Sequence, residues 1–432
     1  MAVALVAPPS SGKTEVLQSI ASLPYVHPIA TVTEAALLSC TSRREQAKDA
    51  TGGVLRKVGE FGIVLCKDFT SVLSQNKDTA RAALAALREV YDGSWNRAVG
   101  TDGGRMLSWQ GKCGLIGGVT PSLDRYAGVV TALGDRYVLL RLPDTDPARM
   151  SARALDHLGS ESAMRAELTE AMTGLIAGAD PAKVIRPLTP PERAQLTALA
   201  TYTARARTAI ERDGYTSELL VMPQPEGTGR IVLQLRRLYG GLDALGVPEA
   251  QRWELLRRIA RDCVPAVRTA LIAALVAVEG PVLTTRLASS VGMVVKTARR
   301  HLEDLALLRI IDRAKSTRKA RTGAEEVLDP ENAPDQWSAT PWLREFWPAA
   351  GGGTEKNHHA RMGIKGHGDD QHANTDDTPP RTFPSHPDEP TDPRPHCTIC
   401  GQPLLPTGPE RTVCERCHLA TQTPKHDAEE TA

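Results

Sequence analysis

The sequence predicts an α/β sheet domain, then a helical region, an all-α/winged-helix domain and a small cysteine-rich ribbon. Three observations carry this prediction. Buried-strand patterns alternate with helical patterns up to about residue 143, a Gly-containing turn joins two helical patterns near residue 292, and four Cys residues cluster after residue 396. Alternating strands and helices favour a sheet with helices packed on its faces.

Length and composition limit the protein classes that fit. The chain has 432 residues, of which 41% are apolar and 24% charged, which is a globular composition. The formal net charge of +1 excludes a protein that coats nucleic acid with a uniformly basic surface, but it allows a local basic patch. We expect a core at 1–145, a helical lid with linker helices at 146–263, a winged-helix domain at 264–348, a disordered linker at 349–395, a zinc ribbon at 396–420 and a disordered tail at 421–432.

Targeting and membrane signals are weak. The longest charge-free apolar run, 269–278, is about half of the ~20 residues that a spanning helix needs. The N-terminus lacks the basic segment of a signal peptide. The sequence therefore predicts a cytoplasmic protein with no membrane partner.

The predicted core contains four short apolar runs that are typical of buried strands. They are Val3–Val6, Gly62–Cys66, Leu115–Val119 and Tyr137–Leu142. A helical pattern covers Asp78–Tyr91, and turn-rich and apolar pieces between Trp95 and Lys112 predict a hairpin. In the next region Pro190–Asp213 predicts a helix with Thr189 as its N-cap.

A phosphate-binding loop follows the first strand. The segment Ala7-Pro-Pro-Ser-Ser-Gly-Lys-Thr14 lies between an apolar strand and a helix, which is the context that a phosphate loop requires. Backbone N–H groups of such a loop cradle phosphates, its lysine reaches the β- and γ-phosphates, and its hydroxyl holds Mg²⁺. The candidate nucleotide-binding residues are Pro9, Ser10, Ser11, Gly12, Lys13, Thr14 and Glu15. The alternative is a chance Gly-Lys-Thr at a strand–helix turn.

Three further residues are candidates for hydrolysis chemistry. Asp68 follows the second apolar run and would order Mg²⁺ or polarise the attacking water. The alternative is that Asp68 simply ends a strand. Thr120 ends the third run with a hydroxyl that would orient water. Arg136 opens the fourth run and would neutralise phosphate charge in a neighbouring subunit.

The order of these motifs resembles the AAA+ ATPases, and most closely the core of the minichromosome maintenance helicases. The resemblance makes the fold an AAA+-like P-loop NTPase core with a helical lid, and implies ATP and Mg²⁺ as cofactors. On it, Lys67 occupies the Mg²⁺-aspartate position, Asp68 the catalytic-glutamate position and Thr120 the first sensor position. It also implies Arg136 as an arginine finger and Arg230, in Thr228-Gly-Arg-Ile-Val-Leu, as the second sensor. The chain also resembles ATP-binding proteins of phages and integrated elements.

A helix-turn-helix is predicted in the second half of the chain. An apolar helix over Val264–Val278 is followed by Thr284–Val291, a turn at Gly292-Met293 and a helix from Val294 to about Leu307. The last helix carries Lys296, Thr297, Arg299 and Arg300 where a recognition helix meets base edges. A strand and a basic wing then supply Arg313, Lys315, Arg318, Lys319 and Arg321 for phosphate contacts. The alternative is a protein-binding helical module with a solvated basic face.

Two Cys-x-x-Cys pairs predict a structural zinc site near the C-terminus. The four ligands are Cys397, Cys400, Cys414 and Cys417, and Zn²⁺ is the expected metal. The ribbon would bind either DNA or a protein.

Two functions follow from these motifs. The first is an ATP-binding and ATP-hydrolysing protein that acts on DNA, of helicase or replication-initiation type, in a phage or mobile element. Its partners would be DNA, further copies of the chain in a ring or filament, and replication proteins. The second is a DNA-binding winged-helix regulator whose phosphate loop is a nucleotide switch or a relic. A third, non-DNA assembly protein, would use the same modules for protein contacts.

Overall fold

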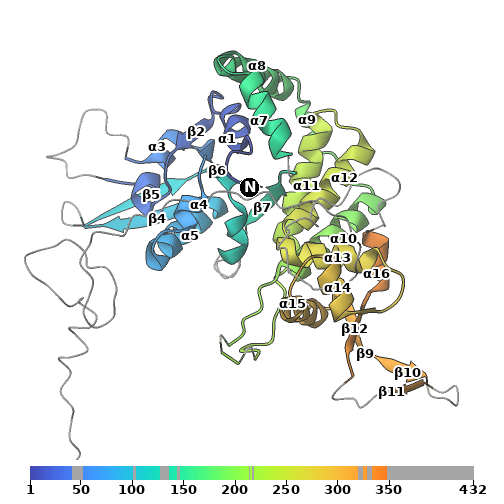
Figure 1. Cartoon of the computed structure of the whole chain (residues 1–432). Helices are drawn as coiled ribbons and strands as arrows, with labels where there is room; N and C mark the ends of the chain where they lie inside the picture. Colours follow the sequence, from blue (N-terminus) through green and yellow to red (C-terminus); the bar gives the residue numbers. More distant parts are fainter. Residues whose placement is uncertain are drawn as a thin grey trace, which may run out of the picture. The chain divides into compact units, whose positions relative to one another are not determined.

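The computed structural model describes most of the first 347 residues (Figure 1). The described residues are 1–40, 52–100, 104–126, 136–143, 146–213, 215–216, 218–319, 325–327 and 333–347. They all belong to one compact unit, Met1–Ile364. The predicted linker, zinc ribbon and tail lie outside the described residues. No helix among the described residues is long and apolar enough to span a membrane.

A five-stranded parallel sheet forms the N-terminal part, and the four predicted strands are β1, β3, β6 and β7, whereas β2 was not predicted. Its strands are β1 (Ala2–Val6), β2 (Val26–Ile29), β3 (Phe61–Cys66), β6 (Lys112–Val119) and β7 (Tyr137–Arg141). The strand order is β2-β3-β6-β1-β7, and every neighbouring pair is parallel. The first strand therefore lies between β6 and β7, and the carboxyl ends of all five strands meet at one edge.

Helices cover both faces of this sheet. They are α1 (Lys13–Gln18), α2 (Glu34–Leu37), α3 (Val54–Val58), α4 (Thr70–Leu73) and α5 (Lys77–Asp92). Side chains alternate along each strand, so that Val64 and Cys66 face one core with α2 to α5, and Leu65 faces another with Leu17 of α1. A strand buried on both faces needs a continuous apolar run, which is why these strands are readable from the sequence.

The predicted hairpin is confirmed. Strands β4 (Ser94–Val99) and β5 (Arg105–Gln110) pair antiparallel, with Trp95 opposite Trp109. Both tryptophans are buried against the sheet core. The apolar faces of the two strands fix their register, and the tip of the hairpin lies partly outside the described residues.

Helices dominate the region after β7. They are α7 (Pro147–Asp156), α8 (Glu161–Ala177), α9 (Pro181–Val184), α10 (Pro190–Arg207), α11 (Gly229–Ala244) and α12 (Glu249–Asp262). The predicted N-cap of α10 is confirmed, because Thr189 and Glu192 form a reciprocal capping box.

The predicted end of α10 at Asp213 is wrong, since the helix stops at Arg207. Arg268 is buried and donates to the carbonyl oxygens of Ala206 and Thr208 at 2.9 and 2.7 Å. These contacts satisfy carbonyls at the helix end, so the chain turns away without an unsatisfied terminus.

The described residues of 264–347 form three helices, a short final helix and two small antiparallel sheets. The helices are α13 (Ala266–Val276), α14 (Thr284–Ser290), α15 (Val295–Leu307) and α16 (Pro341–Phe346). The strands are β8 (Val282–Leu283), β9 (Ile311–Lys315), β10 (Thr317–Lys319), β11 (Glu325–Val327) and β12 (Asp335–Ala339). Strands β8, β12 and β9 form one sheet, and β10 pairs with β11. The predicted helix over Val264–Val278 is shorter, because Pro265 is its N-cap.

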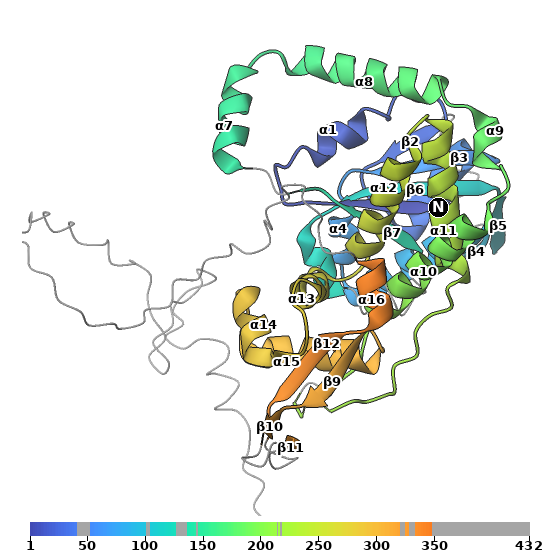
Figure 2. The ribbon, with the colours of Figure 1, turned by 90° about the vertical axis from the view of Figure 1, so that its right-hand side faces the viewer.

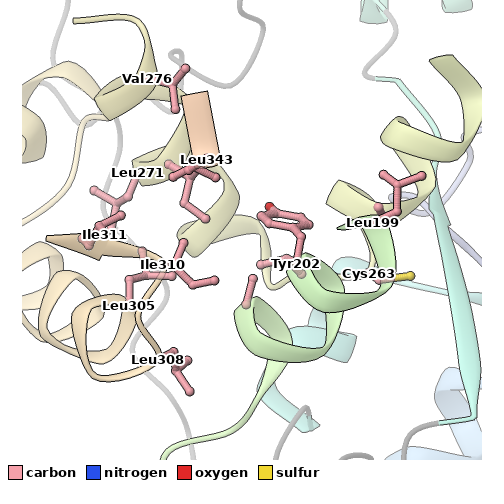
Figure 3. Close-up of a cluster of buried hydrophobic side chains, with 14 of the residues drawn as sticks. Leu199, Tyr202, Cys263, Leu271, Val276, Leu305, Leu308, Ile310, Ile311 and Leu343 are labelled. Carbon is pink, nitrogen blue, oxygen red and sulfur yellow. The ribbon is translucent and has the colours of Figure 1, made fainter. Parts of the chain in front are cut away.

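The helical region and residues 264–347 share one apolar core (Figure 3). Tyr202 of α10 is buried and stacks on Phe346 of α16, with ring centroids 4.8 Å apart. Leu271, Leu305 and Ile310 belong to the same core as Leu199. The helices predicted as a lid and the predicted winged-helix domain are therefore packed together.

Candidate functional site

The phosphate loop lies at the carboxyl end of β1, in the middle of the parallel sheet. Ser10 and Gly12 have positive φ angles of 59° and 81°, so the loop bends sharply before α1. A glycine adopts this conformation at little cost, whereas Ser10 is strained by it. The backbone N–H groups of residues 11–14 have no acceptor among the described residues. They form the kind of N–H cluster that binds anions.

Two side chains of the loop reinforce this character. The Ser11 hydroxyl is buried and has no hydrogen-bond partner among the described residues. The Lys13 ammonium donates to the carbonyl oxygens of Ala7 and Pro8, both at 2.5 Å. Partial burial lowers the pKa of Lys13, while the negative charge of Asp68 acts in the opposite direction. Lys13 is thus held over its own loop, facing an acid from the neighbouring part of the sheet.

Asp68 comes from the end of β3. Its Oδ1 accepts the backbone N–H of Ser71 at 3.3 Å, and the Ser71 hydroxyl donates to the Asp68 carbonyl at 2.7 Å. These bonds fix the turn into α4 and leave the second carboxylate oxygen available. Lys67 precedes Asp68, and its charge acts on Glu15 of α1.

Thr120 comes from the end of β6, between β3 and β1. Its backbone N–H donates to the Thr70 hydroxyl at 2.8 Å, and its own hydroxyl lies 2.6 Å from the hydroxyl of Ser122. Thr70 was not singled out from the sequence, although it follows Asp68 by two residues. The three hydroxyls connect the ends of two neighbouring strands.

Two glycines in β6, which were not predicted to belong to the site, allow this close approach. A Cβ on Gly118 would lie 2.4 Å from the Lys67 carbonyl oxygen, and one on Gly117 would lie 3.1 Å from the Phe69 Cβ. The Phe69 N–H also donates to the Gly118 carbonyl at 2.8 Å. Gly-Gly at a strand end followed by Val-Thr is the signal for this packing.

Glu15, the last predicted nucleotide-binding residue, forms an ion pair with Arg165. The Arg165 guanidinium of α8 donates to both Glu15 carboxylate oxygens, at 2.7 and 2.9 Å. This pairing lowers the pKa of Glu15. Because α1 and α8 are far apart in sequence, nothing local to either helix predicts the pair.

Arg136 lies at the opposite, amino edge of the sheet, because Ala2 of β1 is paired with Tyr137. It is 8% exposed and forms an ion pair with Asp92 at 2.6 Å. Its guanidinium also lies 5.5 Å from the Tyr91 ring centroid, and its carbonyl accepts the Gln234 side-chain amide at 2.6 Å. The structure therefore does not bring Arg136 to the phosphate loop of its own chain.

Arg230 begins α11 and is partly exposed. It makes no hydrogen bond or ion pair with any described residue. One turn further along, Gln234 is buried and contacts Tyr91 and Arg136. The helix of the predicted second sensor is thus fixed to the amino edge of the sheet.

A cavity is also found at that amino edge, lined by residues that include Ala2, Leu87, Tyr91, Cys113 and Arg136. Its lining is mainly apolar. It is distant from the phosphate loop along β1, so it does not belong to the candidate nucleotide site.

A second candidate surface is formed by α15. Lys296, Thr297, Arg299 and Arg300 are all exposed, and none makes a hydrogen bond or ion pair with a described residue. Ala298, Leu302 and Leu305 on the opposite face are buried. The helix therefore presents its basic residues to solvent and its apolar residues to the core.

The basic residues of strand β9 are paired with a carboxylate, unlike the exposed basic residues of α15. Arg313 makes two hydrogen bonds to the buried carboxylate of Asp335, at 3.0 and 2.9 Å, and Lys315 lies 3.4 Å from the same carboxylate. Burial raises the pKa of Asp335, but the pairings with Arg313 and Lys315 together outweigh it and hold the pKa below its ordinary value. Arg318 and Lys319 lie in β10, and Arg321 lies outside the described residues.

Among the described residues no group of three or more His, Cys, Asp or Glu side chains is arranged to hold a metal ion. The predicted zinc ligands Cys397, Cys400, Cys414 and Cys417 fall outside those residues. The zinc site therefore stays a prediction.

Comparison with known proteins gives a structural likeness but no family. No family model matches the chain, and no curated protein matches it. Among solved structures, the chain is similar to the Orc1 protein of Aeropyrum pernix in complex with DNA, at 16% sequence identity and a TM-score of 0.21. The similarity covers 79% of this chain and 86% of the other.

Proposed function

We propose that this chain is an AAA+-like ATPase that binds and hydrolyses ATP and acts on DNA, as a helicase or a replication initiator of a phage or mobile element. One observation carries the proposal. The phosphate loop, Asp68 and Thr120 come from three neighbouring parallel strands and meet at one edge of the sheet. In open α/β sheets, ligands bind at this edge.

The residues of this edge fit a nucleotide with Mg²⁺. The N–H groups of residues 11–14 and the unpartnered Ser11 hydroxyl would hold the phosphates. Lys13 would leave its loop carbonyls and bind the β- and γ-phosphates, and Thr14 would hold Mg²⁺, which neutralises phosphate charge. Asp68 would orient the attacking water through its free carboxylate oxygen, and Thr120 would hold the water through its hydroxyl.

DNA is the proposed macromolecular partner. The order of three helices, a three-stranded antiparallel sheet and the β10–β11 pair supports a winged helix, with α15 as its recognition helix. The free cations of α15 would contact phosphates and base edges. Arg318, Lys319 and Arg321 of the wing would add phosphate contacts.

Several copies of the chain would work together in a ring or filament. The phosphate loop and Arg136 lie at opposite edges of the same sheet. Arg136 would therefore serve the nucleotide of a neighbouring copy, after release from Asp92. Arg230 has no partner among the described residues and would contact the nucleotide from the lid. Replication proteins are further proposed partners.

The decisive experiment compares wild type with Lys13→Ala. We expect the wild-type chain to bind ATP and to hydrolyse it faster with single- or double-stranded DNA, and Lys13→Ala to lose both properties. Lys57→Ala removes an exposed lysine of α3 and should behave as wild type. Equal ATP binding by wild type and Lys13→Ala would overturn the proposal.

A specific observation favours a second candidate, a DNA-binding regulator with a nucleotide switch. Lys67 stands where the resemblance requires the Mg²⁺ aspartate, and Asp68 is already engaged by Ser71. ATP would then bind without turnover. Tight binding of a defined DNA sequence together with no DNA-stimulated hydrolysis would select this candidate.

We also propose a structural Zn²⁺ held by Cys397, Cys400, Cys414 and Cys417. The support is the spacing of the two Cys-x-x-Cys pairs. Wild type should contain one zinc per chain by elemental measurement, and Cys397→Ser should lose it. Full zinc content in that variant would point to other ligands.

A further inference from the structure

The residues that follow Thr120 form a short 3-10 turn, Pro121–Tyr126, which contains Asp124. We call this segment the Asp124 turn. The two carboxylate oxygens of Asp124 accept hydrogen bonds from different parts of the chain. The Arg141 guanidinium, at the end of β7, donates to Oδ1 at 2.6 Å, and the Ala266 backbone N–H, at the first residue of α13, donates to Oδ2 at 3.1 Å. Asp124 therefore links the carboxyl edge of the sheet to the first helix of the predicted winged-helix domain.

The Asp124 turn is bonded directly to Thr120. The Leu123 N–H donates to the Thr120 carbonyl oxygen at 3.0 Å, and the Ser122 hydroxyl lies 2.6 Å from the Thr120 hydroxyl. The Leu123 side chain is buried in the core of the sheet. Because the turn is short and bonded to Thr120 at two points, a displacement of Thr120 would be passed on to Asp124.

Arg141 fixes the connection between α12 and α13 to the same edge of the sheet. It is paired with Val6, the last residue of β1 before the phosphate loop. Besides its bond to Asp124, its guanidinium donates to the carbonyl oxygens of Asp262 and Val264, at 3.0 and 3.3 Å. The Arg141 side chain is 17% exposed. A guanidinium that donates to one carboxylate and two carbonyls is held in one orientation, so the start of α13 is fixed beside the strand of the phosphate loop.

Helix α13 extends the connection to α15. It lies between α12 on one side and α14 and α15 on the other (Figure 2). Arg268, two residues after Ala266, is 5% exposed and donates to the Asp304 carboxylate of α15 at 3.4 Å. Asp304 belongs to the helix whose Arg299 and Arg300 are exposed. Hydrogen bonds and one packed helix therefore join Thr120 to the helix with the exposed basic face.

We propose that Asp124 couples nucleotide binding at the phosphate loop to DNA binding by α15. ATP would place a γ-phosphate and an attacking water next to Thr120, whereas ADP would not, so the two nucleotides differ in their contacts with the turn. A ligand shifts a protein between two arrangements only through such a difference in contacts. Asp124 is a positioning residue, because Arg141 and Ala266 engage both of its oxygens and it acts through them. The inference rests on the proposed function for ATP and DNA, and adds the residue that links the two sites.

Linked binding measurements on the full chain test the coupling. The DNA dissociation constant is measured with a non-hydrolysable ATP analogue and with ADP, and the dissociation constants of both nucleotides are measured with and without DNA. In wild type the two nucleotides should change DNA affinity by at least about fivefold, and DNA should change the ratio of the nucleotide affinities by the same factor. Asp124→Asn should reduce both factors to below about twofold, because a neutral amide binds Arg141 and the Ala266 N–H more weakly. Its affinity for DNA alone and for the ATP analogue alone should match wild type.

A second variant breaks only the contact with α13. Ala266→Pro removes the N–H group that donates to Asp124 and keeps the bond between Asp124 and Arg141. Proline is tolerated at the first residue of a helix, and Pro265 already has φ −52° and ψ 135°, the extended conformation that a following proline requires. Ala266 is exposed, so the variant should fold with nearly wild-type thermal stability. It should lose the coupling as Asp124→Asn does, and it decides the question if Asp124→Asn does not fold.

The matched control makes the same change in α12. Glu249→Pro places proline at the first residue of that helix, after Pro248, whose φ and ψ are −57° and 146°, and it should keep the wild-type coupling. Wild-type coupling in Ala266→Pro or in folded Asp124→Asn would overturn the inference, as would an equal loss of coupling in Glu249→Pro. A wild-type chain that binds ATP and DNA independently of each other would also overturn it. A wild-type chain that fails to bind one of the two would instead overturn the proposed function.

Discussion

The Arg212 guanidinium donates to Oδ1 of Asp304 at 2.8 Å, and both side chains are at most 9% exposed. Arg212 lies in the segment after α10, and Asp304 lies on α15. Arg268 of α13 approaches the other carboxylate oxygen at 3.4 Å and also holds the end of α10. One buried carboxylate thus joins the end of α10 and the segment after it to the helix with the exposed basic face.

Replacing this carboxylate should destabilise the fold. Asp304→Asn removes the carboxylate paired with the buried Arg268 and the nearer of two carboxylates paired with Arg212, the other being Glu303 at 3.8 Å. Breaking a buried ion pair in this way costs about 3–5 kcal/mol of unfolding free energy. Denaturant unfolding of the full chain measures the loss. Asp312→Asn changes an exposed acid of β9 and should shift stability by less than about 0.5 kcal/mol. If both variants unfold alike, the Asp304 contacts contribute little.

Acid should remove a specific contribution of Glu192. Arg186 donates to this buried carboxylate at 2.5 Å, and Tyr239 donates to it at 2.6 Å. The Arg186 contact is the main reason why the pKa of Glu192 lies well below its ordinary value of 4.5. A depressed pKa means that the unfolded chain takes up the proton first, so the stabilisation is complete above about pH 5 and declines as pH falls.

The matching measurement compares wild type with Glu192→Gln across pH. The variant should be about 2 kcal/mol less stable near pH 7, and this difference should shrink below pH 4.5. Glu254→Gln, an exposed acid on α12, supplies the control and should show no such difference. A gap between wild type and Glu192→Gln that stays constant down to pH 3 would contradict the assigned pKa direction.

Local sequence signals predicted the sheet and its phosphate loop well. A strand buried on both faces has a continuous apolar run, and a phosphate loop has a fixed spacing of Gly, Lys and Thr. Both signals therefore lie within a few consecutive residues. The hairpin and the Thr189 cap were predicted correctly because their signals also lie within short stretches of sequence.

Contacts between distant segments were not predictable in this way. Helix α10 ends at Arg207 because Arg268 satisfies its last carbonyls, and no residue near Asp213 signals this. The Glu15–Arg165 pair joins helices that are close only after folding. Arg313 was predicted from its charge as a DNA contact, yet its pairing with Asp335 depends on the register of β9 and β12.

The difference between the exposed basic residues of α15 and the paired Arg313 gives a prediction for DNA binding. Lys296, Arg299 and Arg300 are exposed and unpaired among the described residues, whereas Arg313 is bonded to Asp335. The triple alanine variant of the first three should weaken DNA binding at all sequences and reduce the salt slope by nearly 3, at ~0.9 per phosphate contact. Arg313→Ala should mainly lower stability.

Fluorescence titrations of duplex DNA at several salt concentrations measure the slope. Arg56→Ala with Lys57→Ala removes exposed cations from α3 and provides the control. A slope that is unchanged in the triple variant, or that falls most in Arg313→Ala, would contradict the assignment of α15 as the DNA-facing helix.

The last prediction separates two roles of Arg136. This side chain is paired with Asp92 and held against Tyr91, so it supports the amino edge of the sheet. As an arginine finger for a neighbouring copy it would also stabilise the transition state of hydrolysis. Removing Asp92 abolishes the pairing but keeps the guanidinium, so the two roles respond differently to two variants.

We expect Arg136→Ala to retain ATP binding and to lose turnover by about a thousandfold or more. Asp92→Asn should retain turnover, because the Arg136 guanidinium is still present, while losing thermal stability. Steady-state ATPase assays, nucleotide titration and thermal unfolding measure the three properties on the same preparations. If Arg136→Ala and Asp92→Asn lose stability equally and turnover only follows the folded fraction, Arg136 is a structural residue and another cation must complete the site.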